Sequence, residues 1–403
     1  RECLPRNLRG RGLWAAARIG FWRVPSPYGR TGLDPLQSHP PPTDPMTPSS
    51  LLGLYLSRDI ALTPAPEGRG LELPADHGNA VAELAAANSG AALFDASARG
   101  QLLLTGSDSG DLLQRILAGD VRSLAAGQIQ ENLLLTPKGR VRFSFTVERH
   151  GDVFRLSTAP GDAGDLAKAL DAFVFAEDVT FEEASAAHAP LELLGPGAAK
   201  ILEALIGSPM DLAPGSHAEF TWNGATLAVA HCRVLGANGW RLDAAAEGVA
   251  ALWQALAECG ATPAGLDARE ALRTQNVAAL VGVELPSDGE QAPYPQEALL
   301  EDAFSLAKGC YVGQEVVAKL DTYGGLNRKL TAFEVDSREP IDSGTALLTN
   351  AGEEAGVVTT WSPVPGQDSA RILAYVKVRQ ADAGPFRAGP SGQHLKPLSE
   401  SLP

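Results

Sequence analysis

Residues 101–117 read QLLLTGSDSGDLLQRIL, which predicts a strand, a tight turn and an amphipathic helix. Residues 191–206, LELLGPGAAKILEALI, have the same order of features. Counted from Gly106 and from Gly195, four apolar helix positions fall at the same offsets of +6, +7, +10 and +11. The match predicts an internal duplication. A chance match stays open, because a strand, a glycine and a helix often follow one another.

The chain outside these two units alternates short strands and amphipathic helices joined by hairpin-length links, which favours α+β halves over one parallel sheet. From residue 329 the apolar runs are short and separated by Gly, Pro, Asn and Asp, which is typical of a small β-barrel. We therefore predict five segments: a basic Pro-rich extension (1–45), a first α+β domain (46–185), a second α+β domain (186–328), a β-barrel (329–380) and a loose tail (381–403).

Composition restricts the class of function. The 403 residues carry a formal net charge of -15, which opposes strong direct binding to nucleic acids or to anionic membranes. The four cysteines lie at positions 3, 232, 259 and 310 without any C-x-x-C pair, so we expect neither a disulfide framework nor a zinc ribbon, and we predict no metal-ligand set. No apolar run is long enough to span a membrane. These features predict a soluble protein of the reducing cytoplasm.

The first 45 residues have a composition of their own. They contain seven Arg, no Lys and three acids, a net charge of +4, and seven Pro between Pro25 and Pro45. A transit peptide is one interpretation. An extension that adds nothing to the fold and is disordered is the other, and it is the one that we favour.

The segment Lys308-Gly309-Cys310-Tyr311-Val312-Gly313-Gln314-Glu315 is the most unusual in the chain. A thiol beside a lysine and before a predicted helix (314–320) lies in positive potential, which lowers the pKa of a cysteine. Cys310 is therefore a candidate reactive or metal-binding thiol that faces a pocket, and Cys310 and Lys308 are the two candidate catalytic residues. The alternative is a buried structural cysteine on a tight turn.

The same segment resembles the signature of the YgfZ family, folate-binding proteins of iron–sulfur cluster maintenance within the glycine-cleavage T-protein (aminomethyltransferase) superfamily. The resemblance covers about residues 50–380. Further matching segments are Phe94-Asp95-Ala96-Ser97, the run from Pro263 to Arg273, Pro295-Gln296-Glu297-Ala298 and the strand Ala355 to Thr360.

The resemblance implies a three-lobed ring of two related α+β domains and a C-terminal β-barrel around a pocket for tetrahydrofolate or a one-carbon derivative. Because the glutamate tail of folate is anionic, cations are expected at the mouth of that pocket. Arg269, Arg273 and Lys308 are the basic candidates for folate contact, and Glu297 is a possible carboxylate partner. Around Cys310 the resemblance implies a site shaped by Gly309, Tyr311, Gly313, Gln314 and Glu315. For the two arginines, a solvated helix face is the alternative.

Departures from the superfamily pattern bear on the reaction. T-proteins carry an aspartate just after a glycine-rich turn, and aligning on Lys138-Gly139-Arg140-Val141 places Phe143 or Ser144 there. Neither side chain can act as a general base near neutral pH. A second superfamily carboxylate is replaced by Arg241 after Gly239-Trp240. Enzymatic activity is therefore left open.

The function that the resemblance implies is support for the assembly or repair of iron–sulfur enzymes, including those that modify tRNA. The partners would be folate and iron–sulfur enzymes or cluster-assembly proteins. Two alternatives remain: a folate-dependent aminomethyltransferase or demethylase, and a non-catalytic interaction scaffold in which Cys310 is structural.

Overall fold

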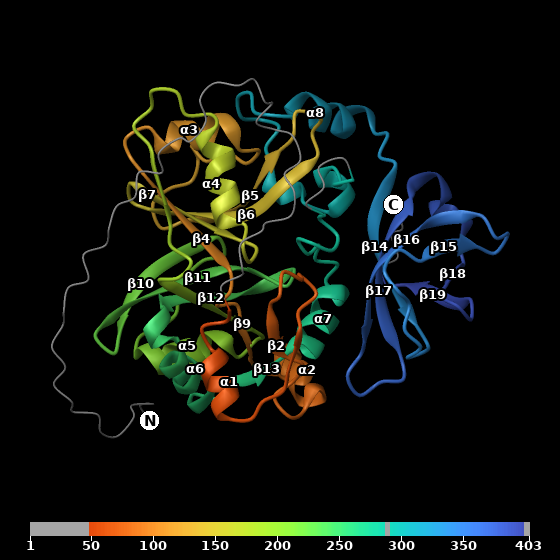
Figure 1. Cartoon of the computed structure of the whole chain (residues 1–403), viewed down its shortest axis with the longest axis horizontal. Helices are drawn as coiled ribbons and strands as arrows, with labels where there is room; N and C mark the ends of the chain where they lie inside the picture. Colours follow the sequence, from red (N-terminus) through yellow and green to blue (C-terminus); the bar gives the residue numbers. More distant parts are fainter. Residues whose placement is uncertain (1–47, 287–290, 399–403) are drawn as a thin grey trace.

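A computed structural model describes residues 48–286 and 291–398. Two α+β units lie one above the other, and a β-barrel lies beside them (Figure 1). This architecture confirms the predicted class, an α+β fold of two related units with a C-terminal barrel. The proposed extension over residues 1–45 lies outside the described residues.

The first unit contains a five-stranded sheet with the strand order β5-β6-β7-β4-β8. Helices α3 and α4 cover its outer face, where Leu113, Leu166 and Val147 belong to one buried apolar cluster. The elements are β4 (Gly100–Thr105), α3 (Ser109–Ile116), β5 (Ile129–Leu135), β6 (Val141–His150), β7 (Val153–Thr158), α4 (Ala163–Asp171) and β8 (Thr180–Glu183).

The second unit contains a six-stranded sheet with the order β10-β11-β12-β9-β3-β13. Helices α5 and α6 cover its outer face around the fully buried Trp253. The elements are β9 (His188–Leu194), α5 (Ala198–Ile206), β10 (Ser216–Trp222), β11 (Ala225–Val234), β12 (Ala237–Ala245), η1 (Ala246–Gly248), α6 (Val249–Glu258) and β13 (Thr262–Ala264).

The two sheets repeat one arrangement. Three antiparallel strands, β5-β6-β7 and β10-β11-β12, lead in each sheet to the strand that opens the unit, β4 or β9. The turn after that strand holds Gly106 at φ +113° and Gly195 at φ +130°, and backbone atoms would lie closer than 3.0 Å to a Cβ at either position. Only glycine meets both demands. The repeated sequence pattern therefore corresponds to a repeated structure.

The boundary between the units differs from the prediction. Residues 48–95 were assigned to the first domain, but their strand β3 (Ala92–Asp95) pairs with β9 and β13 of the second sheet. The same segment places Leu51 and Tyr55 in the apolar core of the second unit. Sequence order favours pairing with the next strand, whereas burial of both Leu93 and Phe94 requires cover on both faces of β3.

The remaining elements of this segment are α1 (Leu52–Ser57), β1 (Leu62–Pro64), β2 (Glu72–Pro74) and α2 (Ala80–Ser89). Helix α2 packs with α7 (Leu266–Gln275) over the inner face of β3 and β13. A connecting segment follows α7 and contains η2 (Pro295–Ala298), η3 (Glu301–Ala303) and α8 (Gln314–Tyr323). The helix predicted over 314–320 is thus present.

The barrel is closed by six strands in the order β14-β17-β16-β15-β18-β19. Its elements are β14 (Arg328–Val335), β15 (Ala346–Thr349), β16 (Glu354–Pro363), β17 (Ala370–Lys377), η4 (Val378–Ala383), β18 (Phe386–Ala388) and β19 (Gln393–Pro397). The prediction of a loose tail from residue 381 was wrong. Strands β18 and β19 pair with β15 and β14, and this pairing closes the barrel.

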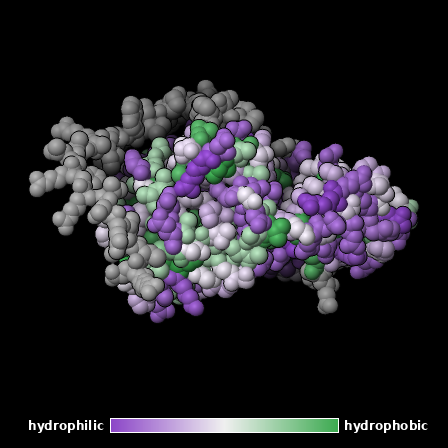
Figure 2. All heavy atoms as spheres, turned by 90° about the horizontal axis from the view of Figure 1, so that it is seen from below, coloured by the Kyte–Doolittle hydropathy of each residue, from purple (hydrophilic) through white to green (hydrophobic). Residues whose placement is uncertain are grey.

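Hydrophobic residues on the face shown in Figure 2 form scattered small groups, and the barrel surface there is mostly hydrophilic. Among residues 48–286 and 291–398, no helix has the length and apolar character needed to cross a membrane.

Candidate functional site

Cys310 lies in the loop between η3 and α8, and its side chain is exposed and free of any disulfide. An exposed position excludes the alternative of a cysteine buried in the core. The loop itself is tied to the first unit, because the amide of Ser305 donates to the carbonyl of Ala118 just beyond α3 (2.9 Å). The thiol is therefore presented to solvent from an anchored segment.

Lys308 provides the main anchor of this loop. Its Nζ donates to the carbonyl oxygens of Leu117 (2.6 Å) and Gly119 (2.8 Å), and the side chain is 9% exposed. Burial lowers the pKa of Lys308 to about 8. A lysine committed to two backbone carbonyls is not available at the mouth of a pocket. The prediction that Lys308 contacts an anionic ligand is therefore replaced by a structural role at the end of α3.

Gly313 and Tyr311 hold the other end of the loop against the β5–β6 turn. Gly313 adopts φ +82°, and a Cβ there would lie 2.6 Å from the carbonyl oxygen of Thr136 and 2.9 Å from the Cα of Gly139. Tyr311 packs into a buried cluster with Leu133 of β5, and its hydroxyl has no hydrogen-bond partner among the described residues. Burial raises the pKa of Tyr311 to about 12. Both residues thus shape the site through packing.

The other residues of the motif have different surroundings. A Cβ at Gly309 would meet no atom within 4 Å, and its φ lies outside the left-handed region, so neither packing nor conformation requires glycine there. Gln314 is the first residue of α8 and is half-buried. Glu315 is exposed and pairs with Lys319 one turn along the same helix (2.6 Å). Glu315 therefore belongs to the solvated face of α8.

The two arginines predicted to contact folate are engaged inside the protein. Arg269 forms a buried ion pair with Glu67. Arg273 is 1% exposed and donates to Glu270 (2.7 Å), Glu284 (2.8 Å) and the hydroxyl of Thr360 in β16 (2.8 Å). Nearby carboxylates raise the pKa of both arginines in spite of burial. Arg273 thus joins α7 to the barrel, and neither the folate role nor the solvated-face alternative describes it.

Glu297 is also committed internally. It is 2% exposed, accepts the amide of Tyr294 (3.2 Å) and pairs with Arg328 at the start of β14 (3.2 Å). These contacts form the N-terminal cap of η2 and connect it to the barrel. The predicted set of Arg269, Arg273, Lys308 and Glu297 therefore does not converge on one ligand site.

The positions at which the superfamily aspartate was sought lie on opposite faces of β6. Phe143 packs against the apolar core under α3 and α4. Ser144 lies on the opposite face, which is turned toward the second unit. Thr146, on the same face as Ser144, accepts a hydrogen bond from Arg241 of that unit (3.1 Å). Glu131 of β5 pairs in register with Thr146 and shares its face. Burial raises the pKa of Glu131.

The inner faces of the two sheets meet through charged side chains that sequence reasoning missed. Arg241 of β12 pairs with Glu148 of β6, and Arg155 of β7 pairs with Asp243 of β12 (2.5 Å). Arg241 lowers the pKa of Glu148 in spite of burial, so the carboxylate is ionised. The alternation of polar and apolar residues in β6 was a usable signal, because it marks one polar face. It did not reveal which strand lies opposite.

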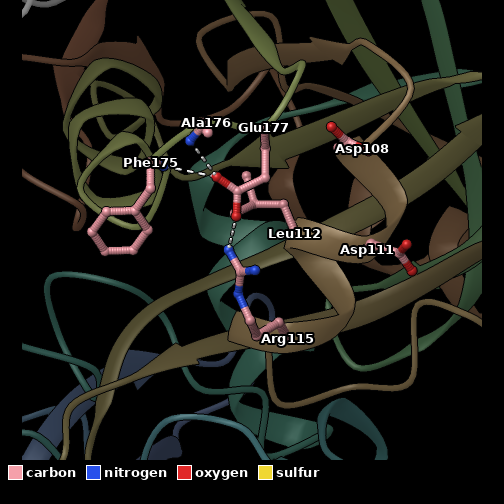
Figure 3. A pocket seen from close by; sticks show the side chains of 7 residues that line it. All are labelled: Asp108, Asp111, Leu112, Arg115, Phe175, Ala176 and Glu177. Atoms are coloured by element: carbon pink, nitrogen blue, oxygen red, sulfur yellow. Dashed lines mark hydrogen bonds and ion pairs between the residues drawn. The ribbon is translucent and has the colours of Figure 1, made fainter.

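A further hollow lies on the surface of the first unit, where α3 meets the loop after α4 (Figure 3). Its centre is the ion pair between Arg115 and Glu177 (2.6 Å), and Glu177 also accepts the amides of Phe175 and Ala176. These donors lower the pKa of Glu177 to about 2. The other lining residues are Asp108, Asp111 and Leu112. None of the predicted site residues lines this hollow.

Comparison with known proteins defines the class. The fold matches the glycine cleavage system aminomethyltransferase T of Bartonella henselae with a TM-score of 0.76 at 21% identity, over 88% of this chain and 97% of that one. The chain thus has an aminomethyltransferase-like fold.

The family model described as the GCVT N-terminal domain matches residues 55–307, and the chain belongs to this family. Similar proteins include aminomethyltransferases of Herpetosiphon aurantiacus (30% identical, 79% of this chain and 86% of the relative) and Symbiobacterium thermophilum (32%, 78% and 86%). Assignment to YgfZ proteins within the superfamily stays a prediction.

Proposed function

We propose that the protein binds a reduced folate between its two α+β units and supports the assembly or repair of iron–sulfur enzymes through Cys310. The observation that carries the proposal is the exposed thiol on a loop anchored at Lys308 and Gly313. An exposed cysteine held by its neighbours can react without unfolding of the core. The YgfZ-like segment 308–315 supplies the reason for choosing iron–sulfur enzymes as clients.

A different cation is needed to bind the anionic tail of folate, because Arg269, Arg273 and Lys308 form internal ion pairs or hydrogen bonds. Arg233 of β11 is the replacement. Its side chain is 45% exposed and pairs with Asp302 of η3 (2.9 Å), shortly before the Cys310 loop. The charge of Arg233 also acts on the half-buried Glu131. An anionic tail that approached this region would take over Arg233 from the solvent-exposed Asp302.

Folate binding is tested by calorimetric titration of the full chain with 5-formyltetrahydrofolate. We expect one molecule per chain and at least a tenfold weaker affinity for Arg233→Ala. Arg115→Ala is the matched control, because Arg115 is another exposed arginine paired with a carboxylate, and it should bind as wild type. Absence of binding at about 1 mM folate, the weak end of the affinity scale, would exclude the folate proposal.

The role of Cys310 is tested by complementation in cells that lack the native protein. Cys310→Ala should fold and bind folate but lose support of iron–sulfur enzymes, whereas Cys259→Ala should retain it. Equal complementation by Cys310→Ala would favour the scaffold alternative.

An aminomethyltransferase is the second candidate, because the similar proteins carry that name and because Glu131 is a carboxylate on the inner face beside Thr146. Its raised pKa suits a group that exchanges protons. Folate-dependent release of ammonia from an aminomethyl-lipoyl donor at an enzyme-like rate, lost in Glu131→Gln, would establish this function instead. We expect no such activity, since Phe143 and Ser144 stand where the superfamily has its aspartate.

A further inference from the structure

Glu148, His150 and His217 form a cluster where the two sheets meet. Their potential ligand atoms all lie within 4.8 Å of one another, and the two imidazole rings are 4.1 Å apart between centroids. Glu148 and His150 come from β6, and His217 comes from β10. None of these three residues was predicted as a metal ligand. Strands β6 and β10 are far apart along the chain, and only the folded sheets bring them together.

Hydrogen bonds determine which nitrogen of His217 carries the proton. Its Nε2 lies 3.1 Å from the carbonyl oxygen of Arg149, which can only accept. Nε2 is therefore the protonated nitrogen, and Nδ1 keeps its lone pair. His217 is 7% exposed, and its Nδ1 is buried without a hydrogen-bond partner among the described residues.

His150 lies between two carboxylates. Its Nδ1 is 3.2 Å from Oε1 of Glu219, and its Nε2 is 3.0 Å from Oε2 of Glu148. In the tautomer that donates through Nδ1 to Glu219, the lone pair of Nε2 faces Glu148. A cation held between Nε2 and Oε2 would be bound by both atoms.

We propose that Glu148, His150 and His217 bind a divalent transition-metal ion, with zinc as the best match to two imidazoles and one carboxylate. The ligand atoms would be Oε2, Nε2 and Nδ1 respectively. Tetrahedral zinc at about 2.0–2.1 Å from its ligands separates them by roughly 3.3 Å, so small side-chain rotations complete the set. The backbone carbonyl of Arg149 and the carboxylate of Glu219 act as the outer partners that such histidines require.

The surrounding charges are compatible with a divalent cation. Arg241 donates to Oε1 of Glu148, while Arg155 pairs with Asp243 (2.5 Å) and lies farther from Oε2 of Glu148 (4.0 Å), which remains within reach of a metal ion. Glu219 adds one further negative charge at the edge of the cluster. Three protein ligands also leave a fourth position for water or for another small ligand. This inference is independent of folate binding and of Cys310.

The test is equilibrium dialysis of the tag-free full chain against Zn²⁺, followed by elemental analysis, with Co²⁺ absorption as a second readout of tetrahedral coordination. We expect one metal ion per chain for the wild type. His217→Gln should weaken binding at least 100-fold and abolish the Co²⁺ bands. His231→Gln is the matched control, because that histidine also bonds a backbone carbonyl (Leu212, 2.7 Å) but belongs to no cluster of potential metal ligands among the described residues.

A second variant covers the case in which His217→Gln fails to fold. Glu219 is half-exposed and would act only through His150, so Glu219→Gln should stay folded and lose about 10–100-fold in Zn²⁺ affinity. Less than one bound metal ion in the wild type would overturn the proposal. So would unchanged affinity in a folded Glu219→Gln variant, since Glu219 would then have no part in orienting a metal ligand.

Discussion

Gly309 and Gly313 flank Cys310, but the structure requires glycine at only one of these positions. Gly313 needs a left-handed backbone and touches the β5–β6 turn, whereas Gly309 needs neither. We expect Gly313→Ala to lower the free energy of unfolding by at least about 1–2 kcal/mol, the cost of a left-handed non-glycine residue, with the steric contact added to it. Gly309→Ala should change it by less than about 0.5 kcal/mol.

Urea denaturation of both variants measures this difference. If Gly309→Ala is as stable as wild type yet fails to support iron–sulfur enzymes, close approach of a ligand to the loop becomes the reason for glycine at that position. Equal loss of stability in the two variants would contradict the structural distinction.

Because the pKa of Lys308 is lowered, we expect the free energy of unfolding to depend on pH. The folded-state pKa of about 8 lies below the ordinary value of 10.5, so the unfolded chain binds the proton more tightly between these two values. Stability contributed by this group therefore rises as pH increases from 8 toward 10.5. The neutral amine still has two N–H groups for the carbonyls of Leu117 and Gly119.

Comparison of wild type with Lys308→Met isolates this effect. The difference in free energy of unfolding should be constant below pH 8 and should shift in favour of wild type by up to about 1.4 kcal/mol for each pH unit between pH 8 and 10.5. Lys319→Met, at an exposed lysine of α8, should give a flat difference. A flat difference for Lys308→Met as well would show that the ammonium is fully solvated.

At the scale of elements, Arg273 connects α7 to β16. Its guanidinium bonds Glu270, Glu284 and Thr360, and Glu284 has no exposed surface. Removal of the cation leaves two carboxylates in a buried region, which costs about 3–5 kcal/mol. We therefore expect Arg273→Met to destabilise the protein by that amount and to loosen the barrel from the second unit.

The control is Arg122→Met, because Arg122 pairs with Asp111 at the surface and such pairs contribute about 1 kcal/mol or less. Thermal and urea unfolding of both variants give the comparison. A loss below about 1 kcal/mol for Arg273→Met would mean that the cluster adjusts without the arginine.

At the scale of the whole molecule, the last described strands decide whether the barrel closes. Phe386 of β18 packs edge-on against Phe333 of β14, with ring centroids 5.9 Å apart, and both are buried. A chain that ends after Ala383 loses β18 and β19 and exposes the edges of β14 and β15. Loss of one buried Phe side chain alone costs about 3–5 kcal/mol.

We expect the shortened chain to be cut by protease within residues 328–383 and to melt at a clearly lower temperature. A chain that ends after Leu398 keeps both strands and is the control. Equal protease resistance of the two chains would show that β18 and β19 add nothing to the barrel, as the predicted loose tail implies.

The local pattern of the chain determined the elements and their repetition. The apolar residues after Gly106 and Gly195 form the inner sides of α3 and α5, and the short apolar runs after residue 329 form barrel strands. The segment from Lys308 to Glu315 was correctly singled out as a glycine-flanked turn that leads into a helix. Such features depend on neighbours within a few residues, so periodicity and glycine placement are enough to find them.

Only the tertiary structure decided which distant residues meet. It paired β3 with the second sheet, closed the barrel with β18 and β19, and committed Arg269, Arg273 and Glu297 to internal ion pairs. It also brought His217 of β10 beside His150 of β6. The physical reason is that a buried charge is stable only beside an opposite charge, and a strand edge only when it is paired or covered. In this chain the partners come from residues far apart in the sequence, so local sequence does not reveal them.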